Sequence, residues 1–145
     1  MKATGANVPS VKPSFLLWWR YTRLKMGNPS LKNLISKADK LLQLKFCSLN
    51  HNCIVCGKTG VLGHHYIFKS QSHNLRYSLK NLVALCPSCH ARLHFSGDPL
   101  IIQTILKKKG MKWADELQKE RKVIQKLNKG YLKSVIEELK GGESE

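Results

Sequence analysis

Two pairs of cysteines constrain the fold of this chain more than any other feature of its sequence. Cys53 and Cys56 form one CxxC turn, Cys86 and Cys89 form a second, and the segment 57–85 separates them. Two such turns can bring four thiolates onto one ion at ~2.3 Å in a tetrahedral arrangement. The spacing therefore predicts a structural zinc site. An iron–sulfur cluster or a redox dithiol would use the same cysteines, but neither explains the histidines that lie beside them.

Four histidines form a second group of metal-binding side chains. His64 and His65 lie between the cysteine pairs, whereas His90 and His94 follow the second pair, one turn apart on one face of a predicted helix. One zinc ion has no room for these imidazoles, so we expect a second, reactive metal site. Phosphodiester hydrolysis needs such parts, because a base of near-neutral pKa activates water and a divalent ion stabilises the developing charge. The alternative is a non-catalytic zinc module that binds nucleic acid.

The distribution of charge indicates a polyanionic partner. The chain has a net charge of +16, and residues 1–109 hold 17 lysines and arginines against two acids, Asp39 and Asp98. Such a basic segment repels itself unless a polyanion neutralises it, and nucleic acid is the expected partner. An anionic membrane surface is a poorer candidate, because the helical segments lack a basic amphipathic face with a bulky apolar side.

No stretch of the sequence approaches the ~18 to 20 apolar residues that span a bilayer. The segment 1–13 also lacks the apolar core of a signal peptide. We therefore expect a cytoplasmic protein, where thiols stay reduced and CxxC pairs favour metal over disulfide.

The length of 145 residues predicts one domain with appendages. Asp98-Pro99 is a strong helix start, because an acid can cap the helix and proline suits its first position. The helical tail beyond it is expected to break near Gly130. We expect five segments along the chain: a flexible arm at 1–13, a basic, aromatic and then helical segment at 14–46, a zinc-stapled core at 47–97, C-terminal helices at 98–140, and a frayed tail at 141–145.

The histidines and cysteines together resemble the HNH (ββα-metal) endonucleases, in the branch stapled by two CxxC pairs. The pattern HH…N…H…H is present as His64-His65, Asn81, His90 and His94. The resemblance implies an α+β fold with a zinc-stapled ββα-metal core and flanking helices. It also implies that His65 is the general base and that Asn81 braces the loop that orients it.

The catalytic divalent metal would, by the same resemblance, lie on His64 and His90, with His94 as a third ligand. Many zinc-stapled members carry Asp at the position of His64 and Asn at that of His90. Imidazoles suit Zn²⁺, Ni²⁺ or Mn²⁺ better than Mg²⁺. The identity of the catalytic metal among these four ions stays open.

A narrower resemblance, to the phage NinG (Rap) recombination endonucleases, covers roughly residues 34–140. It rests on the helix before Cys53, on stretches such as Asn74-Leu75-Arg76-Tyr77 and Gly97-Asp98-Pro99-Leu100, and on the C-terminal helices. It implies cleavage of branched recombination intermediates, such as D-loops and Holliday junctions, for a phage or prophage in the host cytoplasm. The alternative with the same chemistry is a sequence-specific restriction or homing nuclease. A homodimer would suit symmetric cutting of a junction.

Several cations are candidates for contacting DNA. Arg76 is a candidate catalytic residue and Arg92 a candidate DNA-binding residue, because a planar guanidinium can clamp a phosphate with two bonds. A solvated or backbone-contacting arginine is the alternative at both positions. The other candidate DNA contacts are Lys58, Lys69, Arg20 and Arg23.

Overall fold

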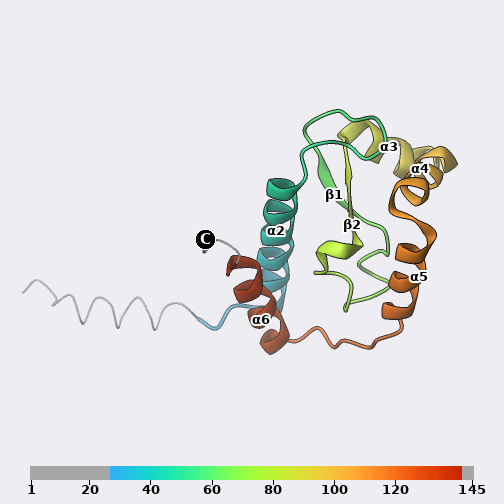
Figure 1. Cartoon of the computed structure of the whole chain (residues 1–145). Coiled ribbons are helices and arrows are strands. Elements are labelled where there is room, and N and C mark those ends of the chain that lie inside the picture. The colour runs from blue at the N-terminus through green and yellow to red at the C-terminus, as the bar shows by residue number, and fades with distance from the viewer. Residues whose placement is uncertain (1–26, 142–145) are drawn as a thin grey trace, which may run out of the picture. The chain divides into compact units, whose positions relative to one another are not determined.

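The computed structural model describes residues 27–141. The chain divides into two units, residues 1–30 and 31–145, and the elements described below belong to the second unit. The elements are α2 (Leu31–Leu49), β1 (Leu62–His65), the short 3-10 helix η1 (Leu79–Asn81), β2 (Leu82–Leu85), α3 (Pro87–Phe95), α4 (Pro99–Lys109), α5 (Met111–Glu120) and α6 (Lys129–Lys140). Helices combined with one two-stranded sheet confirm the predicted α+β class (Figure 1). The arm at 1–13, the stretch at 14–26 with Arg20 and Arg23, and residues 142–145 lie outside the described residues.

The long helix α2 buries one narrow stripe of its surface. Leu34, Ala38, Leu42 and Phe46 recur every fourth residue, and all four are buried. Side chains at this spacing share one helix face, which packs against α6 and β1 (Figure 1). The helix begins directly after Ser30 and continues to Leu49, three residues beyond the helical segment expected to end at residue 46.

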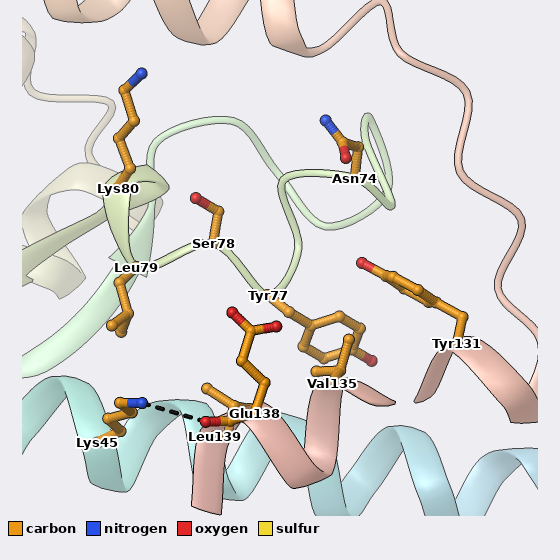
Figure 2. A pocket seen from close by; sticks show the side chains of 10 residues that line it. All are labelled: Lys45, Asn74, Tyr77, Ser78, Leu79, Lys80, Tyr131, Val135, Glu138 and Leu139. Atoms are coloured by element: carbon orange, nitrogen blue, oxygen red, sulfur yellow. Dashed lines mark hydrogen bonds between the residues drawn. The ribbon is translucent and has the colours of Figure 1, made fainter. Parts of the chain in front are cut away.

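Between α2, α6 and residues 74–80 lies a cavity of about 430 Å³ (Figure 2). Lys45 of α2 reaches across to α6 and donates a hydrogen bond of 3.4 Å to the backbone oxygen of Glu138. None of the ten described side chains that line this cavity is a histidine or cysteine. This cavity is thus separate from the predicted metal ligands.

The two strands form an antiparallel hairpin in which His64 pairs with Val83 and His65 with Leu82. All four residues of β2 are apolar and buried. The connection between the strands is long: residues 66–78 form a loop, and η1 then leads into β2. The hairpin therefore places both histidines at the end of β1, where this loop begins.

Gly63 fits β1 against α2 because it has no side chain. The amide of Gln43 binds the backbone of Gly63 in both directions, with N–O distances of 2.8 and 2.9 Å. A Cβ atom on Gly63 would lie 3.0 Å from Phe46 and 3.1 Å from Gln43, closer than ordinary van der Waals contact. The close approach satisfies backbone groups on β1 and fixes the strand that carries His64.

Two of the helices after the hairpin, α4 and α6, begin at side-chain caps. The carboxylate of Asp98 accepts a hydrogen bond of 3.0 Å from the Leu100 amide, and Pro99 opens α4, as the sequence predicts. The side chain of Asn128 accepts a hydrogen bond of 2.9 Å from the Tyr131 amide and starts α6. The break in the helical tail therefore precedes Gly130, which lies inside the first turn of α6.

None of the helices within residues 27–141 combines the length and the apolar character needed to cross a bilayer.

Candidate metal centres

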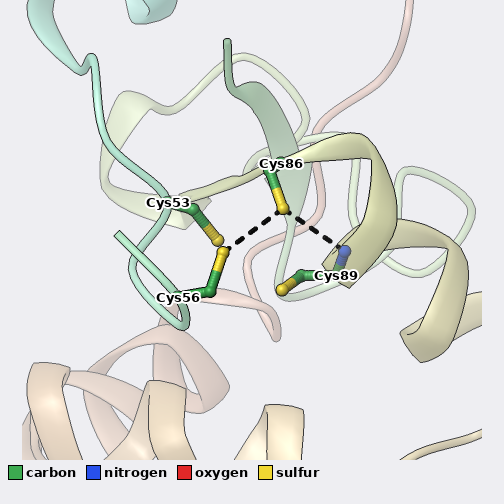
Figure 3. Close-up of side chains that lie close together, drawn as sticks. All are labelled: Cys53, Cys56, Cys86 and Cys89. Carbon is green, nitrogen blue, oxygen red and sulfur yellow. Dashed lines mark hydrogen bonds between the residues drawn. The ribbon is translucent and has the colours of Figure 1, made fainter. Parts of the chain in front are cut away.

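The four cysteines of the CxxC pairs lie together. The sulfur atoms of Cys53, Cys56, Cys86 and Cys89 are all within 4.8 Å of one another, and Cys56 Sγ lies 3.5 Å from Cys86 Sγ (Figure 3). A tetrahedral zinc ion with ~2.3 Å bonds holds its sulfurs roughly 3.8 Å apart. The cluster therefore fits the donor number and spacing of a structural zinc site.

Local backbone structure brings the two turns together. The amide of Ile54, inside the first turn, donates a hydrogen bond of 2.8 Å to Ala84 on β2. Cys86 follows β2 directly and is the N-cap of α3, with Cys89 in the first turn of that helix. A metal on the four thiolates would thus fix the first turn to the junction between β2 and α3.

Two of the clustered thiols have pKa values far from the ordinary value for cysteine. Burial raises the pKa of Cys89 to about 12, and the neighbouring thiols add to this rise. Burial also acts to raise the pKa of Cys53, but hydrogen bonds from nearby backbone N–H groups outweigh it and lower the pKa to about 6. An unusually acidic and an unusually basic thiol are therefore adjacent. A dication stabilises all four as thiolates, which is why such a cluster suits zinc.

Three histidines form the second group. His64 comes from β1, and His90 and His94 come one turn apart from α3. Their nearest ring nitrogens lie within 4.8 Å of one another, and their ring centroids are 4.5 to 5.2 Å apart. A cation with bonds of ~2.1 Å holds its nitrogen ligands roughly 3 to 3.5 Å apart, so the three rings fit one ion. His94 is exposed, so an ion held by these three rings would be accessible to solvent, as a catalytic site requires.

Two of these imidazoles, His64 and His90, have pKa values below the ordinary value for histidine. Burial lowers the pKa of His64 to about 4, and the neighbouring histidines His90, His94 and His65 act in the same direction. The pKa of His90 is also lowered, by burial and then by His94. A histidine with a lowered pKa stays unprotonated at neutral pH, and the unprotonated ring is the metal-binding form.

His65, the neighbour of His64, is held by a different group. Its Nε2 lies 2.8 Å from the backbone oxygen of Arg76 in the 66–78 loop. A carbonyl oxygen only accepts hydrogen bonds, so Nε2 carries the proton and Nδ1 keeps its lone pair. Burial lowers the pKa of His65, although the bond to Arg76 acts in the opposite direction. His65 is thus a buried, neutral imidazole of defined tautomer.

Asn81 is fully buried and binds the 66–78 loop at two points. Its side-chain oxygen accepts a bond of 2.8 Å from the Ile67 amide, and its side-chain nitrogen donates to Ile67 at 2.8 Å and to Leu75 at 3.2 Å. Its backbone oxygen accepts from Tyr66 at 2.9 Å. Both ends of the loop that carries Arg76 are therefore attached to one residue.

A cleft of about 270 Å³ joins the histidines. Its lining residues are Gln43, Gly63, His64, His65, Phe68, Lys69, His90 and His94. The four sequence-predicted histidines therefore lie on one cleft, together with the predicted DNA contact Lys69. Lys58 is exposed elsewhere, at the first CxxC turn.

Both predicted phosphate-binding arginines of the described region are already paired with carboxylates. Arg76 makes two bonds to Asp39, at 3.2 and 2.8 Å. Arg92 binds Asp98, with Nε at 3.1 Å, and points to the start of α4. Neither arginine lines the histidine cleft. A direct phosphate contact by either residue stays a prediction.

The sequence alone did not identify three residues near this cleft as functional. Gln43 anchors β1, Phe68 lies beside His64 with ring centroids 6.2 Å apart, and Asp39 holds Arg76. Only Asp39 left a signal in the sequence, because it is one of the two acids in the basic segment 1–109.

Comparison with known proteins agrees with this geometry. Residues 53–96 match the family model described as HNH endonuclease, a segment that holds all four clustered cysteines and all four cleft histidines. No curated protein and no solved structure matches the chain significantly. The matched domain and the cysteine cluster suggest a metal-dependent nuclease that binds nucleic acid.

We expect the cysteine cluster to contribute a large part of the folding free energy. Cys86→Ser should lower the melting temperature by roughly 20 °C or more, because a structural zinc supplies several kcal/mol to a small domain. Calorimetry with and without a chelator measures this. Cys47→Ser is the matched control, since Cys47 lies outside the cluster and bonds Val61. Equal melting temperatures for Cys86→Ser and the parent would contradict a structural metal.

Proposed function

We propose that this protein is a metal-dependent DNA endonuclease that hydrolyses phosphodiester bonds. The observation that carries the proposal is one cleft with two kinds of imidazole. Three of them, His64, His90 and His94, converge on a point that fits a cation. The fourth, His65, is fixed by a carbonyl with its other nitrogen left unprotonated. Hydrolysis of a phosphodiester needs both groups side by side.

His65 would act as the general base. A water near the cleft gives its proton to Nδ1, because Nε2 already carries one. The lowered pKa of His65 keeps the ring neutral near pH 7, so it is ready to accept that proton. The Arg76 carbonyl then stabilises the imidazolium that forms, through the hydrogen bond it already makes.

His64, His90 and His94 would hold the catalytic divalent cation. When bound, such an ion polarises the phosphate and stabilises charge on the departing oxygen. Three imidazole ligands suit Zn²⁺, Ni²⁺ or Mn²⁺ more than Mg²⁺. Asn81 holds the 66–78 loop at Ile67 and Leu75, and Lys69 lines the cleft beside the histidines.

The substrate we propose is branched DNA, such as D-loops and Holliday junctions, cut in the cytoplasm of a phage-bearing host. This choice is supported by the resemblance to the NinG endonucleases, which extends beyond the residues that match the HNH family model. The strong positive charge of residues 1–109 supports binding to several DNA arms at once. A homodimer would supply the two active sites that symmetric junction cutting requires.

Removal of the general base tests the proposed chemistry. We expect His65→Ala to cut DNA ~10²- to 10⁴-fold more slowly, because the variant loses the group that accepts the proton. DNA affinity should stay near the parental value, whereas the melting temperature should fall somewhat, because a buried ring and its bond to the Arg76 carbonyl are lost. Gel assays with labelled DNA and Mn²⁺ measure the cleavage rate. His51→Ala, at an exposed histidine outside the cleft, should cut like the parent. Equal rates for His65→Ala and His51→Ala would remove His65 from the mechanism.

A panel of DNA shapes tests the proposed substrate. We expect a D-loop and a four-way junction to be cut faster than a linear duplex of the same sequence, because the proposed enzyme selects its substrate by the branched shape of the DNA. Initial rates at equal DNA concentration measure this preference. Cleavage of the duplex alone, at one sequence, would instead favour a restriction or homing nuclease. No cleavage of any DNA with any divalent metal would leave a non-catalytic nucleic-acid-binding module.

A further inference from the structure

The orientation of His65, the proposed general base, depends on the position of the 66–78 loop. The carbonyl that fixes His65 belongs to Arg76, near the end of the connection at 66–78. Asn81 holds this loop at Ile67 and at Leu75, and its bond at Leu75 is the longer, at 3.2 Å. Asn81 does not bind the Arg76 carbonyl itself, so the direction of that carbonyl also depends on what holds the rest of Arg76.

The side chain of Arg76 supplies that restraint through Asp39 on α2. Its Nε lies 3.2 Å from one carboxylate oxygen, and one terminal nitrogen lies 2.8 Å from the other. This paired geometry is the strongest that an arginine makes, and it fixes orientation as well as distance. The two side chains are only 15% and 21% exposed, so solvent screens the pair less than a surface salt bridge.

The same carboxylate holds the loop at a second place. Lys69, which lines the cleft, lies 3.3 Å from Asp39. Asp39 thus connects α2 to the 66–78 loop at two residues: Lys69 near the start of the loop and Arg76 near its end. No other acid precedes Asp98 in the sequence.

The position of Asp39 is unfavourable for simple DNA binding. A carboxylate beside the cleft repels phosphates and cancels the charge of Lys69 and Arg76. A role in DNA affinity therefore does not explain it. Its bonds to Lys69 and Arg76 instead indicate that Asp39 holds the 66–78 loop in position.

We propose that Asp39 is a positioning residue for catalysis, which holds Arg76 so that the Arg76 carbonyl keeps His65 in its reactive tautomer and orientation. The inference rests on the proposed function, because it gives His65 the role of base. Asp39 lies on α2, outside the 53–96 segment that matches the HNH family model. The chain would therefore complete its active site with a helix from outside that segment.

The test is Asp39→Asn, which keeps the shape of the side chain and removes its charge. We expect kcat on labelled DNA to fall by roughly 10- to 100-fold, because the base is displaced by a fraction of an ångström. KM should stay within about twofold or fall, since no phosphate contact is lost and a carboxylate that repels phosphates is removed. Arg76→Lys, which keeps the charge but not the two-bond geometry, should lower kcat in the same way.

A second readout does not depend on activity. Long-range ¹H–¹⁵N spectra of the histidine rings, on zinc-loaded protein without DNA, report which nitrogen carries the proton. In the parent, we expect His65 to be protonated at Nε2, with its signal identified by its loss in His65→Gln. In Asp39→Asn, we expect a mixture of tautomers.

The control is Glu116→Gln, which removes a carboxylate from a pair with Lys80 at 3.0 Å between α5 and η1. This variant should match the parent in kcat and in the spectra. Unchanged kcat and an unchanged His65 tautomer in Asp39→Asn would show that the pair only stabilises the fold. A lower KM with unchanged kcat would show that Asp39 restrains Arg76 from binding phosphate, which also overturns the proposal.

If Asp39→Asn does not fold, Arg76→Lys alone decides by the same two readouts. A parent that cuts no DNA overturns the proposed function, while the spectra still test whether Asp39 fixes His65.

Discussion

The convergence of four thiolates is the constraint on which the rest of this structure depends. The first CxxC turn and the junction between β2 and α3 are far apart in the chain, and the sulfurs come within 4.8 Å of one another. This junction sets the direction in which α3 leaves the hairpin. That direction in turn decides whether His90 and His94 reach His64. The structural site and the candidate catalytic site are therefore two consequences of one arrangement, and a fold with so short a sheet has few other ways to hold three imidazoles together.

The two acids of the basic segment 1–109 show how charge is used here. Asp39 and Asp98 each pair with an arginine, Arg76 and Arg92, and each lies at a structural junction rather than in open solvent. A guanidinium engaged in this way is less available to phosphate, so the described lysines carry more of the positive field that attracts DNA. In this account, the Arg76–Asp39 pair fixes the loop that holds His65, the Arg92–Asp98 pair holds the start of α4, and lysines supply the long-range attraction.

Much of the site follows from short-range sequence pattern. The CxxC spacing predicted the thiolate cluster, the i, i+4 spacing of His90 and His94 placed both on one face of α3, and Asp98-Pro99 marked the start of α4. Contacts between distant segments left no such pattern. The bonds of Gln43 to Gly63 and of Asp39 to Arg76 depend on how α2 packs against the hairpin, which no local rule specifies. The sequence predicts a break in the helical tail near Gly130, and the structure has it at residues 121–128, because the Asn128 cap starts α6 before that glycine.

The central claim is that a second cation binds among the imidazoles of His64, His90 and His94 while the first is held by sulfur. Anomalous diffraction from crystals grown with Ni²⁺, recorded on both sides of the nickel and zinc absorption edges, tests it most directly. The account predicts a zinc peak among the four cysteine sulfurs and a separate nickel peak within bonding distance of the three histidines. Nickel absent from the histidines, or rings turned away from any common ion, would contradict it.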